Sequence, residues 1–434
     1  MVGEWRSAPL SELCEQIADC PHSTPLWTNS GVIVLRNQNI RGGRLDLSSP
    51  SYTDEAHFEQ RSRRARLKAG DLVLTREAPM GEVCIVPANL RCCLGQRMVM
   101  LRPDPKKCDS RFLLYSIQSD AVQHEIKVNE GTGSTVSNLR IPLLEALSIP
   151  HPPLAEQRAI AAVLGALDDK IELNRRMNAT LESMARALFQ SWFVDFDPVR
   201  AKLDPPQADQ PAVLDPATAA LFPSSFEDSE LGLIPKGWTA GKLGDIGTNS
   251  RQGVQPSDIA PNTPYIALEH MPRRCIALGD WEDSAAIASG KSAFKKGHIL
   301  FGKLRPYFHK VGVAPFDGVC STDILVLVPK SSEWFGFLLG HVSSDALIEF
   351  ADLASTGTKM PRTNWSDISS FKVPLPPKSI AAAYTKIIQP MLDRIHANIH
   401  QSRTLATLRD TLLPKLLSGE LSVRNLERSV EAAL

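Results

Sequence analysis

Side chains suited to reading DNA bases stand together in one short segment, made of Arg36, Asn37, Gln38 and Asn39. Arginine pairs with guanine through two hydrogen bonds, and asparagine and glutamine pair in the same way with adenine. On a loop, these four residues are therefore candidates for base recognition. Asparagine is also common in turns, where its side chain caps the backbone, so turn capping remains the alternative. The segment Ala267-Leu268-Glu269-His270 matches this one later in the chain and adds His270 as a candidate.

A second group of candidates carries positive charge or a hydroxyl group that could contact phosphate. The densest basic stretch is 61–68, where Arg63, Arg64 and Arg66 would fix position on DNA without reading its sequence. The alternative is an ordinary solvated charged face. Weaker candidates follow two matched β-prone runs, and they are Thr75, Arg76, Lys303 and Arg305.

Two glycine-containing loops, 131–135 and 355–359, could offer backbone N–H groups and hydroxyls to phosphate. The candidates there, with one arginine just beyond the second loop, are Gly133, Ser134, Thr135, Thr358, Lys359 and Arg362. Turns of this composition are common, so a purely structural role stays open.

Motifs for catalysis are missing. The sequence has no Gly-x-x-x-x-Gly-Lys-Ser/Thr loop, and no G-x-G-x-x-G follows a predicted strand. Residues 204–207 (Asp-Pro-Pro-Gln) are similar to the Asp-Pro-Pro-aromatic motif of DNA methyltransferases that modify an amino group. They lack the aromatic residue that stacks on the flipped base. His396 and His400 have the spacing of a helical zinc pair, but no third ligand is evident, which favours a solvated helix face. We therefore expect no enzyme activity, no metal and no cofactor in this chain.

The composition is that of a soluble protein without an overall basic charge. The 434 residues include 48 basic and 48 acidic side chains, which disfavours non-specific coating of nucleic acid. No apolar run is long enough to cross a membrane, and the start of the chain does not resemble a signal peptide. The eight cysteines form no C-x-x-C pair, so we expect buried thiols and a cytoplasmic location.

The chain repeats one plan about 224 residues apart. Proline-rich segments at 150–153 and 374–377 open two long apolar–polar stretches, 154–193 and 378–417, whose apolar residues recur at heptad spacing. Asn174 and Asn398 fall at the same position of this pattern. We expect two helices that pair as an antiparallel coiled coil; the alternative is that each packs on its own domain.

The segments before the two helices are rich in short β-prone runs bounded by glycine and proline. The pattern predicts an α+β protein with an internal pseudo-two-fold repeat and two strand-rich domains. The predicted parts are a first domain (1–153), a first helix (154–195), a linker (196–237), a second domain (238–377) and a second helix with a tail (378–434).

These segments resemble the specificity subunit of type I restriction-modification systems over nearly the whole chain. The residues that carry the resemblance are 153–158 (Pro-Leu-Ala-Glu-Gln-Arg), 167–171, 191–199 (Ser-Trp-Phe-Val-Asp-Phe-Asp-Pro-Val), 234–238 and 412–421. One departure is that the second helix starts Pro377-Lys378-Ser379, without the Glu-Gln-Arg of the first.

The resemblance implies a non-catalytic subunit in which two target recognition domains each read half of a two-part site on double-stranded DNA. It implies two methyltransferase (modification) subunits as partners, with S-adenosylmethionine bound there, and it allows restriction/translocase subunits that use ATP and Mg²⁺. A scaffold that joins protein partners through the helices, with degenerate recognition domains, is the alternative. A self-contained restriction or modification enzyme is disfavoured by the missing motifs.

Overall fold

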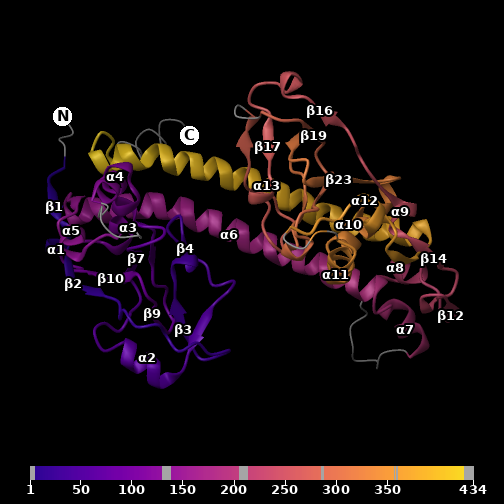
Figure 1. Ribbon diagram of the computed structural model, residues 1–434, viewed down its shortest axis with the longest axis horizontal. Helices are drawn as coiled ribbons and strands as arrows, with labels where there is room; N and C mark the ends of the chain where they lie inside the picture. Colours follow the sequence, from indigo (N-terminus) through magenta and orange to yellow (C-terminus); the bar gives the residue numbers. More distant parts are fainter. Residues whose placement is uncertain are drawn as a thin grey trace. The chain divides into compact units, whose positions relative to one another are not determined.

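A computed structural model describes residues 5–129, 138–204, 214–284, 288–355, 357 and 360–424 (Figure 1). The chain divides into two compact units. Unit 1 comprises Met1–Lys170 with Leu405–Leu434, and unit 2 comprises Ile171–Thr404. Among the described residues no helix is both long and apolar enough to cross a membrane.

Unit 1 is built on two small sheets. An antiparallel sheet has the order β2 (Cys14–Asp19), β10 (Met98–Pro103), β7 (Leu72–Thr75), β8 (Val83–Ile85). A second sheet has the order β6 (Ser51–Thr53), β3 (Val32–Leu35), β9 (Cys92–Leu94), with β3 and β9 parallel. The β-prone runs predicted from the sequence in this domain form β3, β7, β8 and β10, so that prediction is confirmed.

The remaining elements of unit 1 complete its core or lie at its edges. They are β1 (Ser7–Pro9), which pairs with β11 (Ser148–Pro150), the pair β4 (Ile40–Arg41) and β5 (Arg44–Leu45), and the helices α1 (Leu10–Leu13), α2 (Glu55–Arg61), α3 (Ser110–Gln118), α4 (Asp120–Val128) and α5 (Ile141–Glu145). Side chains from α3 join those of β7 and β10 in one buried apolar cluster.

Unit 2 repeats this arrangement. Its antiparallel sheet has the order β15 (Gly247–Asn249), β23 (Ile324–Pro329), β20 (Ile299–Gly302), β21 (Val311–Val313). Its second sheet has the order β16 (Gly253–Val254), β19 (Lys291–Phe294), β22 (Gly318–Cys320), β17 (Pro264–Ile266), β18 (Glu282–Asp283), with β17 and β22 parallel. Each unit therefore combines a four-stranded antiparallel sheet with a second sheet that contains one parallel pair, as the internal repeat predicts.

The other elements of unit 2 also have counterparts in unit 1. They are β14 (Thr239–Lys242), which pairs with β24 (Lys372–Leu375), and the helices α9 (Leu243–Ile246), α10 (Phe335–Val342), α11 (Asp345–Leu353) and α12 (Trp365–Ser369).

Two long helices, α6 (Leu154–Phe193) and α13 (Lys378–Ser418), contribute residues to both units. In unit 2, Asn174 Nδ2 donates to Gln401 Oε1 at 2.9 Å, and Asn398 Nδ2 donates to Asn178 Oδ1 at 2.8 Å. Partner numbers fall along α13 as they rise along α6, so the helices pair antiparallel, as predicted. The buried asparagines bond to polar partners across the seam, which favours one register over its neighbours.

The prediction that 196–237 is a linker without helix or strand is wrong. This segment forms α7 (Asp197–Leu203), α8 (Pro216–Ala220) and a hairpin of β12 (Phe226–Ser229) with β13 (Gly232–Pro235). Pro198 and Pro216 stand in the first turns of α7 and α8, where a missing N–H costs nothing, rather than breaking these helices. Val199, Phe222 and Ile234 are buried in the core of unit 2.

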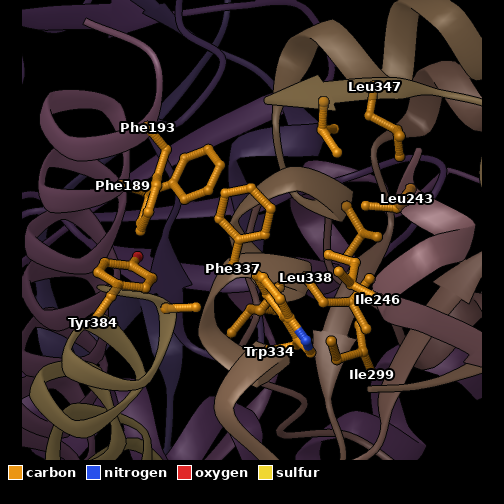
Figure 2. Close-up of a cluster of buried hydrophobic side chains, with 14 of the residues drawn as sticks. Phe189, Phe193, Leu243, Ile246, Ile299, Trp334, Phe337, Leu338, Leu347 and Tyr384 are labelled. Carbon is orange, nitrogen blue, oxygen red and sulfur yellow. The ribbon is translucent and has the colours of Figure 1, made fainter. Parts of the chain in front are cut away.

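Aromatic side chains from both long helices fill the core of unit 2 (Figure 2). Phe193 of α6 packs edge-on against Phe337 at 4.8 Å and against Tyr384 of α13 at 5.1 Å. His396 of α13 is also buried in unit 2, which corrects the expectation of a solvated face there, whereas His400 is exposed as predicted. The helices are thus part of the folded domain and do not merely pass beside it.

Glu182 of α6 is hydrogen-bonded to the backbone of residues 276–277, which lie beside β21 (Val311–Val313). Its carboxylate accepts hydrogen bonds from Ile276 N at 3.0 Å and Ala277 N at 3.1 Å, and from the Cys275 thiol at 3.3 Å. The side chain is buried, and burial raises the pKa of this carboxyl group despite the three donors. Glu182 therefore ties the long helix to the strand-rich part of unit 2.

We expect Glu182→Ala to lower the free energy of unfolding of the chain by about 1–3 kcal/mol, because it leaves two buried backbone N–H groups without an acceptor. Denaturant titration measures this loss. The matched control is Glu172→Ala on the same helix, which removes an exposed i,i+4 ion pair with Arg176 and should cost less than about 0.5 kcal/mol. Equal losses in the two variants would show that the Glu182 contacts contribute little.

Candidate nucleic-acid interface

Four loops of unit 1 meet beside the end of β7 and the start of β10. Backbone hydrogen bonds join them: Gly95 N donates to Leu35 O at 2.8 Å, Arg76 N donates to Arg97 O at 2.8 Å, and Leu139 N donates to Arg76 O at 3.0 Å. We call residues 36–39, 76–82, 95–97 and 138–140 the unit 1 platform. Loops held by a rigid sheet are a common way to present binding side chains.

Unit 2 brings the corresponding four loops together. Ser321 N donates to Ile266 O at 3.0 Å, Lys303 N donates to Asp323 O at 2.9 Å, and Thr363 N donates to Lys303 O at 3.0 Å. We call residues 267–271, 303–310, 321–323 and 360–363 the unit 2 platform. Because the same bonds recur, positions in the two platforms can be matched one to one.

Two predicted base readers, Asn39 and His270, do the same structural work in the two platforms. Asn39 Oδ1 accepts from Arg36 N at 2.9 Å, and His270 Nδ1 accepts from Ala267 N at 3.0 Å. Asn39 is buried, and its Nδ2 also donates to Asp46 O. Each side chain caps a one-turn 3₁₀ helix, η1 (Asn37–Asn39) or η3 (Leu268–His270). For these two residues the capping alternative replaces base reading.

Thr75 and Arg76 are also interior residues, so their predicted role as DNA contacts is corrected. Thr75 Oγ1 accepts from Glu82 N at 3.0 Å within the fold. The Arg76 guanidinium is 6% exposed and donates to Leu139 O at 2.9 Å, to Asp19 at 2.6 Å and to Asn138 at 3.1 Å. Arg76 thereby holds the platform loops together instead of reaching solvent.

The predicted residues that remain exposed on the unit 1 platform are Arg36 and Gln38, with Asn37 half-buried. The Arg36 guanidinium lies 5.0 Å from the ring centre of Trp27, and its Nη1 donates to Ser51 Oγ at 3.3 Å. Asn37 donates to Ala78 O at 3.2 Å. Arg36 and Gln38 thus keep hydrogen-bonding groups available for a base edge.

Two further residues lie in or beside the unit 1 platform that the sequence did not indicate, Arg97 within it and Trp27 next to Arg36. Trp27 is 44% exposed under Arg36, and Arg97 is half exposed with an ion pair to Glu77 at 3.0 Å. Arg97 has φ of 69°, a backbone region that side-chain-bearing residues rarely adopt and that is often found at functional sites. No pattern of residue types marks either position, because their proximity arises from the meeting of separate loops.

The unit 2 platform joins the predicted residues Lys303, Arg305 and Arg362. Arg305 N donates to Pro361 O at 2.8 Å, Leu304 and Arg362 form an isolated β-bridge, and Arg362 pairs with Asp323 at 3.4 Å. Arg305, like Arg97, has a positive φ, here 51°. The structure therefore brings together three cationic residues that are spread over 59 positions of the sequence.

An aromatic pair beside these cations was not predicted. Tyr307 is 49% exposed, and the Arg273 guanidinium lies 4.0 Å from the ring centre of Phe308. Lys310 donates to Leu268 O within the platform, and burial followed by the charge of Arg273 lowers its pKa. Cations interleaved with exposed aromatic rings suit a nucleic acid, since they can contact phosphate and stack on bases.

Comparison with known proteins identifies the family to which a chain with this repeated fold belongs. The sequence model described as "Type I restriction modification DNA specificity domain" matches residues 3–183 and 235–406. The chain belongs to this family. Both matched segments contain one platform each, so the repeated fold corresponds to two specificity domains.

Individual relatives agree with the family. The type I restriction enzyme MjaIX specificity subunit of Methanocaldococcus jannaschii is 28% identical over 370 residues, which are 82% of this chain and 79% of the relative. The HindI specificity subunit of Haemophilus influenzae is 26% identical and covers 82% of this chain and 87% of its own length. A crystal structure of a type I restriction-modification S subunit from M. genitalium has a similar fold, with a TM-score of 0.53, 18% identity and 95% and 96% coverage of the two chains.

The basic stretch of the first specificity domain lies away from its platform. Gln16 Nε2 donates to Arg64 O, and Arg102 Nη2 donates to Arg66 O, which places 64–66 beside the end of β10 opposite Arg97. Arg66 pairs with Glu59 at 2.6 Å, whereas Arg63 and Arg64 are exposed. The structure does not bring Arg63, Arg64 or Arg66 together with the base-reading candidates.

The predicted phosphate contacts in the two glycine-containing loops of the specificity domains, Gly133, Ser134, Thr135, Thr358 and Lys359, lie outside the described residues. The described ends of these loops lead into the platforms at Asn138 and Met360.

Arg36→Ala is expected to weaken binding of the preferred DNA site by about 1–3 kcal/mol and to relax selectivity at one base position, because a bidentate guanine contact would be lost. Competition between oligonucleotides that differ at single positions measures both effects. Lys127→Ala, which removes an exposed cation of α4 outside the platform, is the control. A uniform loss across all sequences would instead identify Arg36 as a phosphate contact.

Proposed function

We propose that this chain is the sequence-recognition subunit of a type I restriction-modification complex and that each platform reads one half of a two-part DNA site. The observation that carries the proposal is one loop scaffold built twice with different side chains. Matched positions hold Arg36 and Ala267, Gln38 and Glu269, and Arg97 and Asp323. Side chains that differ in charge and hydrogen bonding on a shared scaffold are suited to two different half-sites.

In this proposal the paired helices α6 and α13 set the distance between the half-sites. An α-helix of 40 residues has about 11 turns and is about 60 Å long, so it can act as a rigid spacer. The helices also offer a surface for two methyltransferase subunits, which would bind S-adenosylmethionine and modify adenine. Restriction subunits that use ATP and Mg²⁺ would join the same complex, and no catalytic step is assigned to this chain.

A cytoplasmic location forms part of the proposal. All eight cysteines are unpaired, and six of them are buried. Burial raises the pKa of the Cys84 and Cys320 thiols to about 12, so these groups are protonated and unreactive at neutral pH. Thiols of this kind suit a reducing compartment.

Mapping N6-methyladenine across the genome, with and without this gene, tests the proposal. The expected result is a two-part motif with a fixed gap that disappears when the gene is deleted. If no motif changes, DNA binding by the reconstituted complex decides. A complex that assembles normally but binds all duplexes equally would exclude sequence recognition and favour the scaffold alternative.

Inserting one heptad into both helices, between residues 170 and 171 and between 404 and 405, should lengthen the gap and keep both half-sites. Seven residues add about 10 Å, which is close to three base pairs of duplex at about 3.4 Å each. Methylation mapping or site selection from random duplexes reads out the gap. An insertion in α6 alone is the control and should disturb helix pairing on the unit 1 side of the insertion, where Arg409 of α13 pairs with Asp168 of α6 at 2.7 Å. An unchanged gap in the double insertion would rule out the helices as a ruler.

A further inference from the structure

A basic pocket in unit 1 plays no part in the function proposed above. It has a volume of about 540 Å³ and lies beside the residues that precede β1 and the residues that connect β11 to α6. Its lining includes Trp5, Arg6, Lys106, Lys107 and His151. We call this site the Trp5 pocket.

The charge of the Trp5 pocket is largely uncompensated. Arg6 and Lys106 are exposed, and their side chains have no partner among the described residues. Lys107 Nζ donates to the backbone oxygen of Glu12 at 3.0 Å and lies 3.9 Å from the Asp104 carboxylate. Of these three permanent cations, only Lys107 lies within 4 Å of a carboxylate of the described residues, so an acidic ligand would be favoured.

The matching position in unit 2 shows what covers such a tryptophan. Strands β1 and β11 pair with the same register as β14 and β24, which makes Trp238 the counterpart of Trp5. Trp238 is 2% exposed, and the ring of Phe196 packs edge-on against it at 5.6 Å. Phe196 stands between Asp195 and Asp197, so an acidic, aromatic segment of this chain closes the site in unit 2.

Among the described residues of unit 1, no acidic, aromatic segment covers Trp5 in this way. Trp5 is partly exposed, its Nε1 donates to Leu416 O at 3.2 Å, and no aromatic ring of the described residues packs on it. The described residues that follow α13, 419–424, have no aromatic side chain and so include no counterpart of Phe196. The backbone hydrogen bonds that follow β10 and β23 match, and they make Lys107 the counterpart of Glu333 in unit 2. At this position unit 1 therefore has a positive charge where unit 2 has a negative one.

The position of the Trp5 pocket argues for a protein ligand over DNA. Arg97 of the platform precedes β10, whereas Lys106 and Lys107 follow it. The six residues of β10 span about 20 Å, so the pocket lies at the opposite end of the sheet from the base-reading candidates. A duplex held on the platform would not need these cations.

We propose that the Trp5 pocket binds an acidic segment of a partner protein and that this segment places an aromatic side chain against Trp5, as Phe196 is placed against Trp238. The carboxylates of the segment pair with Arg6, Lys106 and Lys107. This interaction does not depend on DNA reading by the platforms.

The test uses the full chain and a fluorescent peptide that copies residues 194–199, Val-Asp-Phe-Asp-Pro-Val. Fluorescence anisotropy at low salt should show saturable binding. Lys106→Glu combined with Lys107→Glu should weaken binding at least about tenfold, because two attractive charges become repulsive. The matched control, Lys295→Glu with Lys296→Glu, changes two adjacent exposed lysines of unit 2 and should leave binding unchanged. Peptides with Phe→Ala, or with both Asp→Asn, should bind more weakly.

Three results would overturn the proposal. One is no binding of the peptide by the wild-type chain at millimolar concentration, and another is equal binding by the wild type and the Lys106/Lys107 variant. The third is a loss of duplex DNA affinity or of self-association in that variant with peptide binding intact, which would identify the pocket as a phosphate site or as an interface between copies of this chain. Thermal melting confirms that each variant is folded.

Discussion

Replacing residues 1–153 with the corresponding domain of another specificity subunit will change one half of the recognised DNA site and leave the other half unchanged. The platform of unit 1 is formed entirely within this segment, and its supporting sheets have their own buried clusters. The platform of unit 2 is supported by separate clusters. Because specific sites are bound about 4–10 kcal/mol more tightly than random DNA, the loss of the original half-site should be large.

Site selection from random duplexes, or methylation mapping in cells, reads out this exchange. The reciprocal chimera, in which 238–377 is exchanged, is the control and should change the other half. The new domain must still pack against Ile160 and Leu164 of α6, which belong to the core of unit 1. A chimera in which both half-sites change would contradict independent reading by the two domains.

The repeated fold could be predicted because its signals are local and occur twice. Heptad spacing defines α6 and α13 to within about two residues at each end, and the short apolar runs define the central strands. The segment 196–237 could not be predicted, since proline breaks helices in the interior and begins them in the first turn. Which case applies depends on contacts such as those of Phe222 with Trp192, and these join distant parts of the chain.

The candidate site was predicted in part, for a related reason. Residue type shows which side chains could contact DNA, but burial decides which of them are free to do so. Arg36 and Arg76 have the same side chain, yet one lies over Trp27 at the surface and the other is fully bonded inside. Arg97 and Tyr307 were missed, as was Arg273, whose guanidinium lies over Phe308, because no short motif marks positions that only the meeting of separate loops brings together. The boundaries proposed for the recognition domains stay a prediction.

Acid should destabilise unit 2 because it buries three histidines with lowered pKa values, His309, His341 and His396, of which the last two have the largest shifts. His341 of α10 packs edge-on against Phe337 at 4.5 Å and Phe189 at 4.9 Å, and its Nε2 has no partner. Both ring nitrogens of His396 also lack partners. Burial lowers the pKa from 6.5 to about 3 for His341 and to about 4 for His396. As the pH falls below 6.5, the unfolded chain therefore takes up protons that the folded chain cannot, so stability present above pH 6.5 is lost below it.

The expected loss is about 1.4 kcal/mol per pH unit for each histidine between pH 6.5 and its folded pKa. Glu182 acts in the opposite sense, since its raised pKa makes the folded chain hold a proton more tightly as the pH falls. Variants separate these contributions. His341→Met and His396→Leu should each flatten the dependence of unfolding free energy on pH, whereas His124→Leu, at an exposed position of α4, should leave it unchanged.

Denaturant titration followed by tryptophan fluorescence suits this measurement, because five of the seven tryptophans lie in unit 2, at positions 192, 238, 281, 334 and 365. A slope that is the same in the wild type and in both histidine variants would mean that these side chains are charged in the folded state. That result would require a proton acceptor or solvent access at His341 and His396, both of which are buried. The acid response of unit 2 therefore reports directly on whether the long helices are integral to its core, since His396 belongs to α13 and Phe189, which packs on His341, belongs to α6.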